Sequence, residues 1–443
     1  MLAAIDRLLP STTIRNDMPK FLVIQAARFG DLVQTKRLLL SLALRGEVHL
    51  AVDVSLVPLA RVLYPFAELH ALSVHGRPEA ESLARNTAVL DRWQGLPFEA
   101  VYNCNFSGTT AALCRVFEVE QVQGYRPEAG GISRSPWARL GFRLSERRAL
   151  ATMNLVDFWA HFAPEPVEPR RVNPVATPGG RGLGVVLAGR ESRRSLPVPV
   201  LAEVVRTAFG ALGGPRILLL GSRAEQPAAR QLLRQLPGKM LDRVEDCSGK
   251  TDWPALVDAV DGLDALITPD TGIMHLGAHL GVPVLGFFLS SAWLHETGPY
   301  GEGHHVWQTA RSCGPCLETA PCPYDVACGQ PLAQVELLRS IAAVLARLKS
   351  GAPFAAAQAE SWPPLPADLQ LWRTGMDSLG TLPHLLAGSD PHAQERRRVR
   401  DFLAARLHLP MPDESAALAP QAPNIDEWLY NDADWMLPPG RYC

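Results

Sequence analysis

The sequence predicts an α/β protein built from two doubly wound, mostly parallel sheets. Short apolar runs recur along the chain, most of them lack polar–apolar alternation, and helical patterns separate them. Continuous apolar runs are typical of strands buried on both faces of a parallel sheet, and strand–helix alternation implies right-handed crossovers. At 443 residues the chain is too long for one ordinary core, so two domains are expected.

The strands of the first domain are expected at FLVIQ from Phe21, VHLAV from Val48 and VYNC from Val101. Those of the second are expected at VVLA from Val185, ILLLG from Ile217, ALITP from Ala265 and VPVLGFF from Val282. Helical patterns lie between them, for example over 32–44 and 201–212, and a further helix is expected over 332–348.

The domain boundaries follow from composition. Proline and glycine are too dense over 163–184 for a helix or a strand, which predicts a linker between domains at 19–162 and 185–350. Residues 1–18 are expected as an N-terminal extension. Residues 351–443 are expected as a proline-rich extension with one helical stretch, AQERRRVRDFLAARL, in which the arginines at 396–398 form a solvated face.

Composition restricts the partners and the compartment. Apolar residues make up 47% and charged residues 20% of the chain, as in globular proteins. A formal net charge of −2 gives no argument for nucleic acid. There is no apolar run of roughly 18 residues to span a bilayer and no signal-peptide pattern at the start. We therefore expect a cytoplasmic protein, with at most a peripheral contact on the inner face of the cytoplasmic membrane.

The turn after the predicted strand ALITP has the chemistry of a ligand site. Asp270, Thr271 and Gly272 follow that strand where the next helix begins. A helix N-terminus presents unpaired N–H groups and the positive end of its dipole, which suits an anion. The carboxylate can bind hydroxyl groups of the same ligand. The turn therefore favours a ligand with both phosphate and hydroxyl groups, such as a nucleotide-sugar.

Three motifs make the chain resemble glycosyltransferase family 9, the heptosyltransferase family of bacterial lipopolysaccharide synthesis, over about residues 20–330. The strongest is D-T-G-x-x-H-L-x-x-x-x-G-V-P at 270–283. T-G-P-Y at 297–300 supports it, and G-D-x-x-x-T places Gly30, Asp31 and Thr35 near the start. The resemblance implies a GT-B fold, in which two Rossmann-like domains face a central cleft, the first binding the acceptor and the second the nucleotide-sugar.

The resemblance also implies the reaction and its partners. The implied reaction is an inverting, metal-independent transfer of a sugar, which is heptose by family default. The implied partners are a nucleotide-sugar donor such as ADP-heptose and a lipopolysaccharide or other cell-surface glycan as acceptor. Several residues depart from the family pattern. Arg28 stands before the Gly-Asp pair where small residues are usual, and Arg37 stands six positions after Asp31 in place of a proline. The loop LAGRESRRSLPV carries arginines and Leu196-Pro197 where a lysine and Trp-Pro are usual. Leu289-Ser290-Ser291 replaces Gly-Pro-Thr. These departures leave the sugar and the acceptor open.

Roles for individual residues follow from the same resemblance. Asp31 is the expected general base, with an N-cap as the local alternative, and Arg28, Gly30 and Thr35 lie on the acceptor side. The remaining candidates are expected at the sugar donor: Arg190, Arg193 and Arg194 at the phosphates, Glu225 at the ribose, and Asp270, Thr271, Gly272 and His275 at the turn. For Glu225 an exposed helix start, and for His275 a structural histidine, are the alternatives.

Four cysteines lie within sixteen residues, at Cys313, Cys316, Cys322 and Cys328. Thiols at this spacing can form a structural zinc site or hold an iron–sulfur cluster, and the alternative is thiols that brace a loop. A catalytic metal is not expected here, and no cofactor is expected for catalysis.

Two other functions fit the same pattern. A nucleotide-sugar epimerase can share the architecture but would not need Asp31 as a base toward an acceptor. A non-catalytic nucleotide-sugar sensor or scaffold would bind without turnover.

Overall fold

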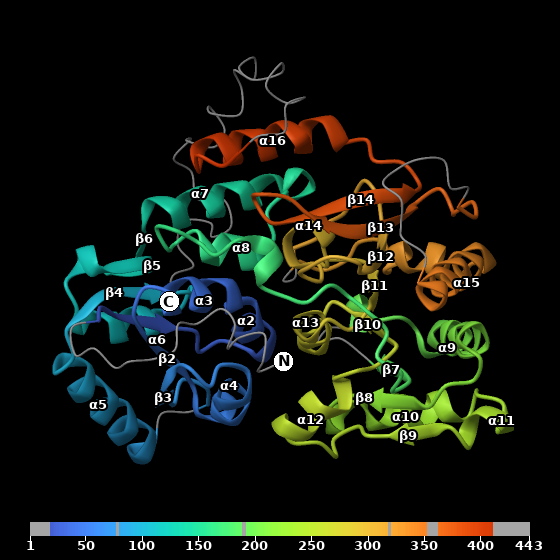
Figure 1. Cartoon of the computed structure of the whole chain (residues 1–443), viewed down its shortest axis with the longest axis horizontal. Helices are drawn as coiled ribbons and strands as arrows, with labels where there is room; N and C mark the ends of the chain where they lie inside the picture. Colours follow the sequence, from blue (N-terminus) through green and yellow to red (C-terminus); the bar gives the residue numbers. More distant parts are fainter. Residues whose placement is uncertain (1–17, 77–78, 188–191, 318–319, 352–361, 411–443) are drawn as a thin grey trace. The chain divides into compact units, whose positions relative to one another are not determined.

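The computed structural model describes residues 18–76, 79–187, 192–317, 320–351 and 362–410. The described residues divide into two compact units, one within 18–148 and 155–168, the other within 149–154 and 169–410. Within the described ranges, no helix has both the length and the apolar character needed to cross a membrane. Each unit contains one sheet with helices packed against it (Figure 1).

The first unit holds a sheet in the order β3-β2-β1-β4-β5-β6. All neighbouring strands are parallel except β5 and β6. The strands are β1 Lys20–Ile24, β2 Glu47–Asp53, β3 Glu68–Leu72, β4 Phe98–Asn103, β5 Val122–Glu128 and β6 Gly131–Arg134. The helices are α2 Phe29–Gln34, α3 Lys36–Ala43, α4 Val57–Leu63, α5 Ala80–Gln94, α6 Gly108–Leu113, α7 Pro136–Leu144 and α8 Leu155–Ala160.

The second unit holds a sheet in the order β14-β13-β12-β11-β10-β7-β8-β9. The strands are β7 Leu183–Val186, β8 Ile217–Leu220, β9 Val244–Asp246, β10 Ala265–Pro269, β11 Val284–Phe288, β12 His305–Thr309, β13 Leu369–Met376 and β14 Thr381–Ala387. The helices are α9 Val198–Leu212, α10 Gln226–Leu233, α11 Gly238–Leu241, α12 Trp253–Val260, α13 Gly272–Leu280, α14 Leu294–Thr297, α15 Val335–Ser350 and α16 Ala393–Arg406.

The expected fold class is confirmed in both units. From β7 to β12, the second sheet has the strand order 3-2-1-4-5-6 of a doubly wound nucleotide-binding fold. Its central strands are fully buried runs such as ILLL of β8 and VLGFF of β11, and the core they belong to includes residues of α9 and α15. Continuous burial on both faces explains why these strands could be recognised from apolar runs alone.

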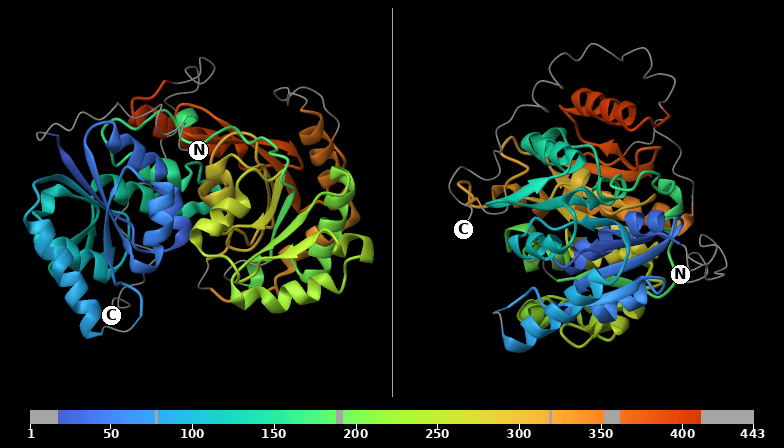
Figure 2. Two further views of the ribbon diagram at one scale, coloured as in Figure 1. Left: turned by 60° about the horizontal axis from the view of Figure 1, so that its bottom comes forward. Right: turned by 90° about the vertical axis from the view of Figure 1, so that its left-hand side faces the viewer.

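Several outer strands of both sheets were not predicted from the sequence. In the first unit β3 and β5 alternate buried with partly exposed residues, and β5 contains Gly124 and Pro127. In the second unit β13 and β14 form an antiparallel hairpin that pairs with β12, shown in red beside it in Figures 1 and 2. The expectation of an extension after residue 350 with a single helix was therefore wrong for residues 369–387.

Helix α16 matches the helical stretch expected there, but one face of it is not solvated. Arg397 and Arg398 are exposed, whereas Arg396 and Arg400 are buried and form ion pairs with Asp390 and Asp377. The expected linker at 163–184 contains one short 3₁₀ turn, Pro169–Arg171, before β7 begins.

Candidate functional site

The candidate sugar-donor site lies where strand order reverses in the second sheet. β7 pairs with β8 on one side and with β10 on the other, so the carboxyl ends of β7 and β10 lie side by side. Ligands of open α/β sheets bind outside the carboxyl ends of the strands at this switch point. The loop after β7 carries the arginines and the loop after β10 carries Asp270, so tertiary structure brings the two sequence candidates together.

Asp270 is the centre of this arrangement. Its side chain is 5% exposed, and Oδ2 accepts a hydrogen bond from Nη2 of Arg194. The same oxygen accepts one from Oγ1 of Thr297 at 2.9 Å. Arg194 also donates to the Asp270 backbone carbonyl at 3.3 Å. A buried carboxylate is stable only when it is paired and hydrogen-bonded, and here Arg194 and Thr297, from two separate segments, supply the partners.

Thr297 was not among the expected site residues. It belongs to the T-G-P-Y stretch, which the sequence analysis used only as a family signature. Asn154 holds the same stretch by donating from Nδ2 to the Gly298 carbonyl at 2.9 Å. The motif therefore positions a hydroxyl against Asp270, and the motif itself was the signal that could have identified Thr297.

His275 lies one turn into α13, with Nε2 at 3.7 Å from Oδ1 of Asp270. The pKa of His275 is lowered to about 4, chiefly by burial, which the charge of Asp270 opposes and the charge of Arg194 reinforces. The imidazole is therefore neutral at pH 7. The imidazole can form a hydrogen bond with the Asp270 carboxylate or with a ligand, but it adds no positive charge to the site.

The backbone at Thr271 begins α13 as the motif requires. Thr271 is the N-cap, and its hydroxyl accepts from the Met274 N–H at 3.3 Å. Gly272 is the first residue of the helix. The motif glycine Gly281 ends it in the left-handed region at φ 77°, and a Cβ there would lie 2.8 Å from Cβ of Pro174. The motif thus fixes both ends of the helix whose N-terminus adjoins Asp270.

The three arginines after β7 differ in their surroundings. Arg194 binds Asp270, whereas Arg193 donates to the carbonyls of Ala320 and Leu317 at 2.6 and 3.0 Å. Arg190 lies outside the described residues. Arg193 therefore fastens the cysteine loop to the loop after β7, which is a structural task that its sequence position did not reveal.

Glu225 follows β8 and is the last residue of the short 3₁₀ turn Arg223–Glu225, whose N-cap is Ser222. Its Oε2 accepts from the Ser222 N–H at 2.6 Å, and Ser222 in return caps Ala224. This capping box corresponds to the helix-start alternative for Glu225. A ribose contact remains a prediction.

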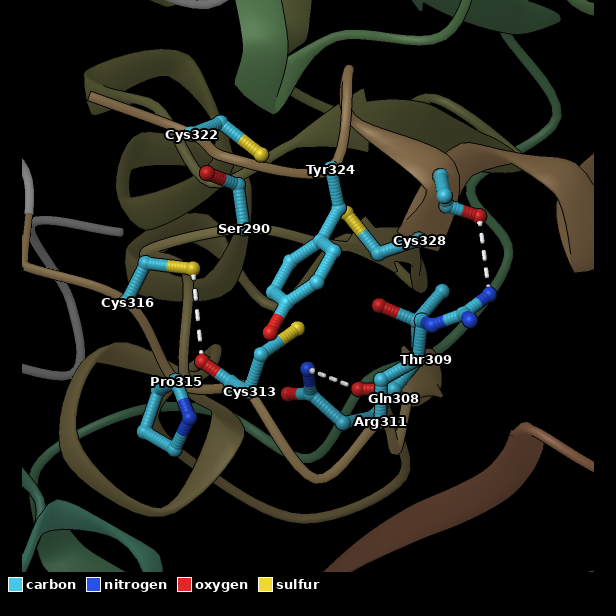
Figure 3. A pocket seen from close by; sticks show the side chains of 12 residues that line it. Ser290, Gln308, Thr309, Arg311, Cys313, Pro315, Cys316, Cys322, Tyr324 and Cys328 are labelled. Atoms are coloured by element: carbon cyan, nitrogen blue, oxygen red, sulfur yellow. Dashed lines mark hydrogen bonds between the residues drawn. The ribbon is translucent and has the colours of Figure 1, made fainter.

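The four loop cysteines line one pocket together with Ser290, Thr309 and Tyr324. Figure 3 shows their side chains arranged around the ring of Tyr324. Burial raises the pKa of the Cys316 and Cys328 thiols, whereas N–H groups of Tyr324 and Val326 lower that of Cys322. In the described part of the chain, the three potential ligands that lie within 4.8 Å of one another are His49, Glu68 and His70, not these cysteines.

The first unit has its own switch point, between β1 and β4. Asn105, just after β4, accepts from the Ala26 N–H at 2.8 Å and donates to the Gln25 side chain, which ties the two loops together. Asp31 follows β1 in the first turn of α2, and the N-cap of that helix is Arg28. The N-cap alternative for Asp31 is therefore wrong.

The residues around Asp31 divide into surface and core. Arg28 is exposed and Gly30 is partly exposed. Thr35 is fully buried and donates to the Leu32 carbonyl at 2.7 Å, so its position supports a structural rather than an acceptor-binding role. Arg37 is also buried and forms an ion pair with Asp157 at 2.6 Å, which explains how the core accepts an arginine there.

Comparisons with known proteins agree with the motifs. Residues 207–325 match the family model "Glycosyltransferase family 9 (heptosyltransferase)". Lipooligosaccharide heptosyltransferase 2 of Haemophilus influenzae is 27% identical over 75 residues, which cover 17% of this chain and 22% of that protein. The match thus spans about a fifth of the relative's length. The resemblance to family 9 is confirmed over this part of the second unit.

Two solved structures share the architecture. A family 9 glycosyltransferase from Veillonella parvula superposes with a TM-score of 0.58 at 16% identity, over 76% of this chain and 100% of that one. An ADP-heptose lipopolysaccharide heptosyltransferase II from E. coli gives a TM-score of 0.52 at 14% identity, over 75% of this chain and 100% of that one. At such identities the likeness concerns the fold, and it confirms the expected two-unit α/β architecture of GT-B type.

Proposed function

We propose that this chain, whose second unit carries the sequence pattern of glycosyltransferase family 9, is a glycosyltransferase that uses a nucleotide-sugar. The observation that carries the proposal is the convergence of Arg194, Asp270 and Thr297 at the switch point of the second sheet. A guanidinium suits the diphosphate, a carboxylate suits sugar hydroxyls, and the N-terminus of α13 adds a positive dipole end.

The named relatives support a proposal for the sugar, the base and the acceptor. Heptosyltransferases match part of the second unit or share the fold, and one of them is an ADP-heptose lipopolysaccharide heptosyltransferase. ADP-heptose is therefore the proposed donor and a lipopolysaccharide or related surface glycan the proposed acceptor. The same proposal places the protein in the cytoplasm, with peripheral contact at the inner membrane face.

The proposed reaction is an inverting displacement without a catalytic metal. Asp31 accepts the proton of an acceptor hydroxyl, whose oxygen forms a bond to the anomeric carbon on the face opposite the leaving group. The bond from that carbon to the diphosphate oxygen breaks, and ADP leaves with the electron pair. Arg194 and the helix N-terminus stabilise its developing charge. Arg190, Arg193 and Glu225 are proposed as further contacts to the nucleotide, with Arg28 and Gly30 on the acceptor side.

The cysteine loop is proposed as a brace for the nucleotide site. Arg193 joins it to the loop after β7, and Cys316 donates its N–H to the Ser290 carbonyl just after β11 at 3.0 Å. A structural zinc or iron–sulfur cluster held by the four thiols would stiffen the same connection.

The substitution Asp31→Asn tests the reaction. It keeps the shape of the side chain but removes the base, so release of ADP in the presence of acceptor should fall by about 100-fold or more. The thermal shift produced by ADP should stay unchanged, because nucleotide binding is assigned to the second unit. Asp91→Asn, on the exposed face of α5, is the matched control.

Other outcomes distinguish the alternatives. Tight binding of nucleotide-sugars by the native chain, with no turnover on any acceptor, would overturn the transferase in favour of a sensor. Interconversion of the sugar without transfer, unaffected by Asp31→Asn, would indicate an epimerase.

A further inference from the structure

Strands β2 and β3 of the first unit carry a cluster of two histidines and a glutamate, away from the loop that holds Asp31. His49 is the third residue of β2, and Glu68 and His70 are the first and third residues of β3. None of these positions lies at the carboxyl end of its strand, whereas Asp31 follows the carboxyl end of β1. The cluster is therefore separate from the candidate site of that unit.

Strand register explains why the three side chains meet. His49 is the register partner of Glu68 in the parallel pair β2–β3. Register partners point to the same face of a sheet, and residues two apart along a strand do so as well. Thus His49, Glu68 and His70 share one face, joined by Glu47, two residues before His49.

The distances suit coordination of one ion. Nδ1 of His49 lies 2.9 Å from Nε2 of His70 and 3.6 Å from Oε2 of Glu68, and all three ligand atoms lie within 4.8 Å of one another. Tetrahedral zinc with bonds of about 2.0–2.2 Å to nitrogen and oxygen places its ligand atoms about 3.3–3.5 Å apart. The observed separations lie on either side of that value.

The protonation states suit a metal too. Both imidazoles are almost fully buried, and burial lowers the pKa of His49 and lowers that of His70 to about 4. They are therefore neutral at pH 7, as metal ligands must be. Glu68 directs Oε2 to His49 while its Oε1 pairs with Arg92.

A second carboxylate, that of Glu47, faces the other ring nitrogen of His49. Nε2 of His49 is buried and lacks a hydrogen-bond partner among the described residues, and Oε1 of Glu47 lies 3.4 Å from it. Metal-binding histidines usually direct their other ring N–H to a carboxylate, which fixes the tautomer and raises ligand basicity. Glu47 is in turn held by Lys20.

We propose that His49, His70 and Glu68 form a binding site for a divalent metal ion of the zinc type, supported from behind by Glu47. In the metal-free chain one proton lies between the two rings, on Nε2 of His70, and it is donated to Nδ1 of His49. On metal binding, that proton moves to Nδ1 of His70, and Nδ1 of His49 and Nε2 of His70 each give a lone pair to the ion. The site cross-links β2 to β3 beneath α5, whose Trp93 ring packs against His70 at 6.0 Å.

Zinc alone is the probe. The parent is the full chain with Cys313, Cys316, Cys322 and Cys328 replaced by serine, so that loop thiolates do not compete, and the native chain is measured beside it. After treatment with a chelator and addition of zinc, the parent should retain one zinc per chain through gel filtration and melt at a higher temperature than without zinc. A cobalt-substituted parent should show a tetrahedral spectrum without thiolate charge-transfer bands.

Variants locate the ion. Glu68→Gln and His70→Gln should abolish retention of zinc, and Glu47→Gln should weaken binding about 10- to 100-fold, as loss of a supporting carboxylate does. His408→Gln, an exposed histidine of the other unit, is the control. Since His70 is buried, Glu68→Gln, whose native side chain is 35% exposed, decides the matter if His70→Gln does not fold. Absence of zinc from the parent, or equal retention by parent and Glu68→Gln, would overturn the proposal.

Discussion

Asp270 shows how much of the proposed nucleotide site depends on a single side chain. The carboxylate is almost fully buried and is held by Arg194 and Thr297, which lie 76 and 27 residues away in the chain. His275 faces its other oxygen as a neutral imidazole. The local charge is therefore one carboxylate balanced by one guanidinium, and an arriving diphosphate would compete with Asp270 for that cation.

Replacing Arg194 by alanine tests this balance. Removing a cation that stabilises a leaving diphosphate should lower kcat/KM by about 100-fold. It should also reduce the thermal shift caused by ADP, because Asp270 would then repel the phosphates. The exposed Arg216, which pairs with Glu245 in the same unit, provides the control variant Arg216→Ala. Equal kinetics for the two variants would rule out a phosphate contact by Arg194.

At the scale of elements, the C-terminal hairpin and α16 are integral parts of the second unit. Arg400 of α16 donates from Nε and Nη2 to both oxygens of Asp377, at 2.7 and 2.5 Å, next to the β13–β14 turn. It also donates to the Thr152 carbonyl at 2.6 Å. Burial acts to raise the pKa of Asp377, but the hydrogen bonds and charge of Arg400 outweigh burial and hold it below its usual range.

Arg400→Met should therefore release α16 from the hairpin. Loss of hydrogen bonds to a partly buried carboxylate should lower the free energy of unfolding by about 2–3 kcal/mol. Urea denaturation measures the loss, and hydrogen exchange should locate the loss of protection in residues 369–406. Arg397→Met, on the exposed face of the same helix, should unfold like the native chain. A clamp at Arg400 is excluded if the two variants unfold at the same urea concentration.

At the scale of the whole molecule, buried neutral histidines recur in both units. Burial lowers the pKa of His70 and His275 to about 4 and that of His304 and His305 to about 3. In the unfolded chain these groups titrate near a pKa of about 6.5. Between those values the unfolded chain binds more protons than the folded one, so acid favours unfolding.

The free energy of unfolding should accordingly fall as the pH is lowered from about 7 to about 5. Each buried histidine should contribute a slope of up to about 1.4 kcal/mol per pH unit once the pH is well below 6.5. Urea denaturation at a series of pH values gives the slope. His304→Gln should reduce it, whereas His392→Gln, at an exposed position, should leave it unchanged. A slope that His304→Gln does not alter would show that this histidine is already protonated in the folded chain.

The strand candidates and the motif residues illustrate what could be predicted in advance. Central strands such as β8 and β11 are continuous apolar runs, so the chain pattern was sufficient to find them. The turn at Asp270 was recognised because its residue types and the helix N-terminus are adjacent in sequence. Strands β3, β5 and β14, which were not predicted, have mixed burial, which leaves a weaker pattern.

Local pattern was thus enough for the doubly wound fold of each unit, the helix that begins after Asp270, and the family resemblance. Contacts between distant segments settled the rest: that Arg194 binds Asp270 while Arg193 binds the cysteine loop, that Arg400 clamps a hairpin, and that strand register gathers His49, Glu68 and His70 on one face. Contacts between side chains that are far apart in the sequence depend on strand register and strand order, and the local sequence around each residue does not determine either.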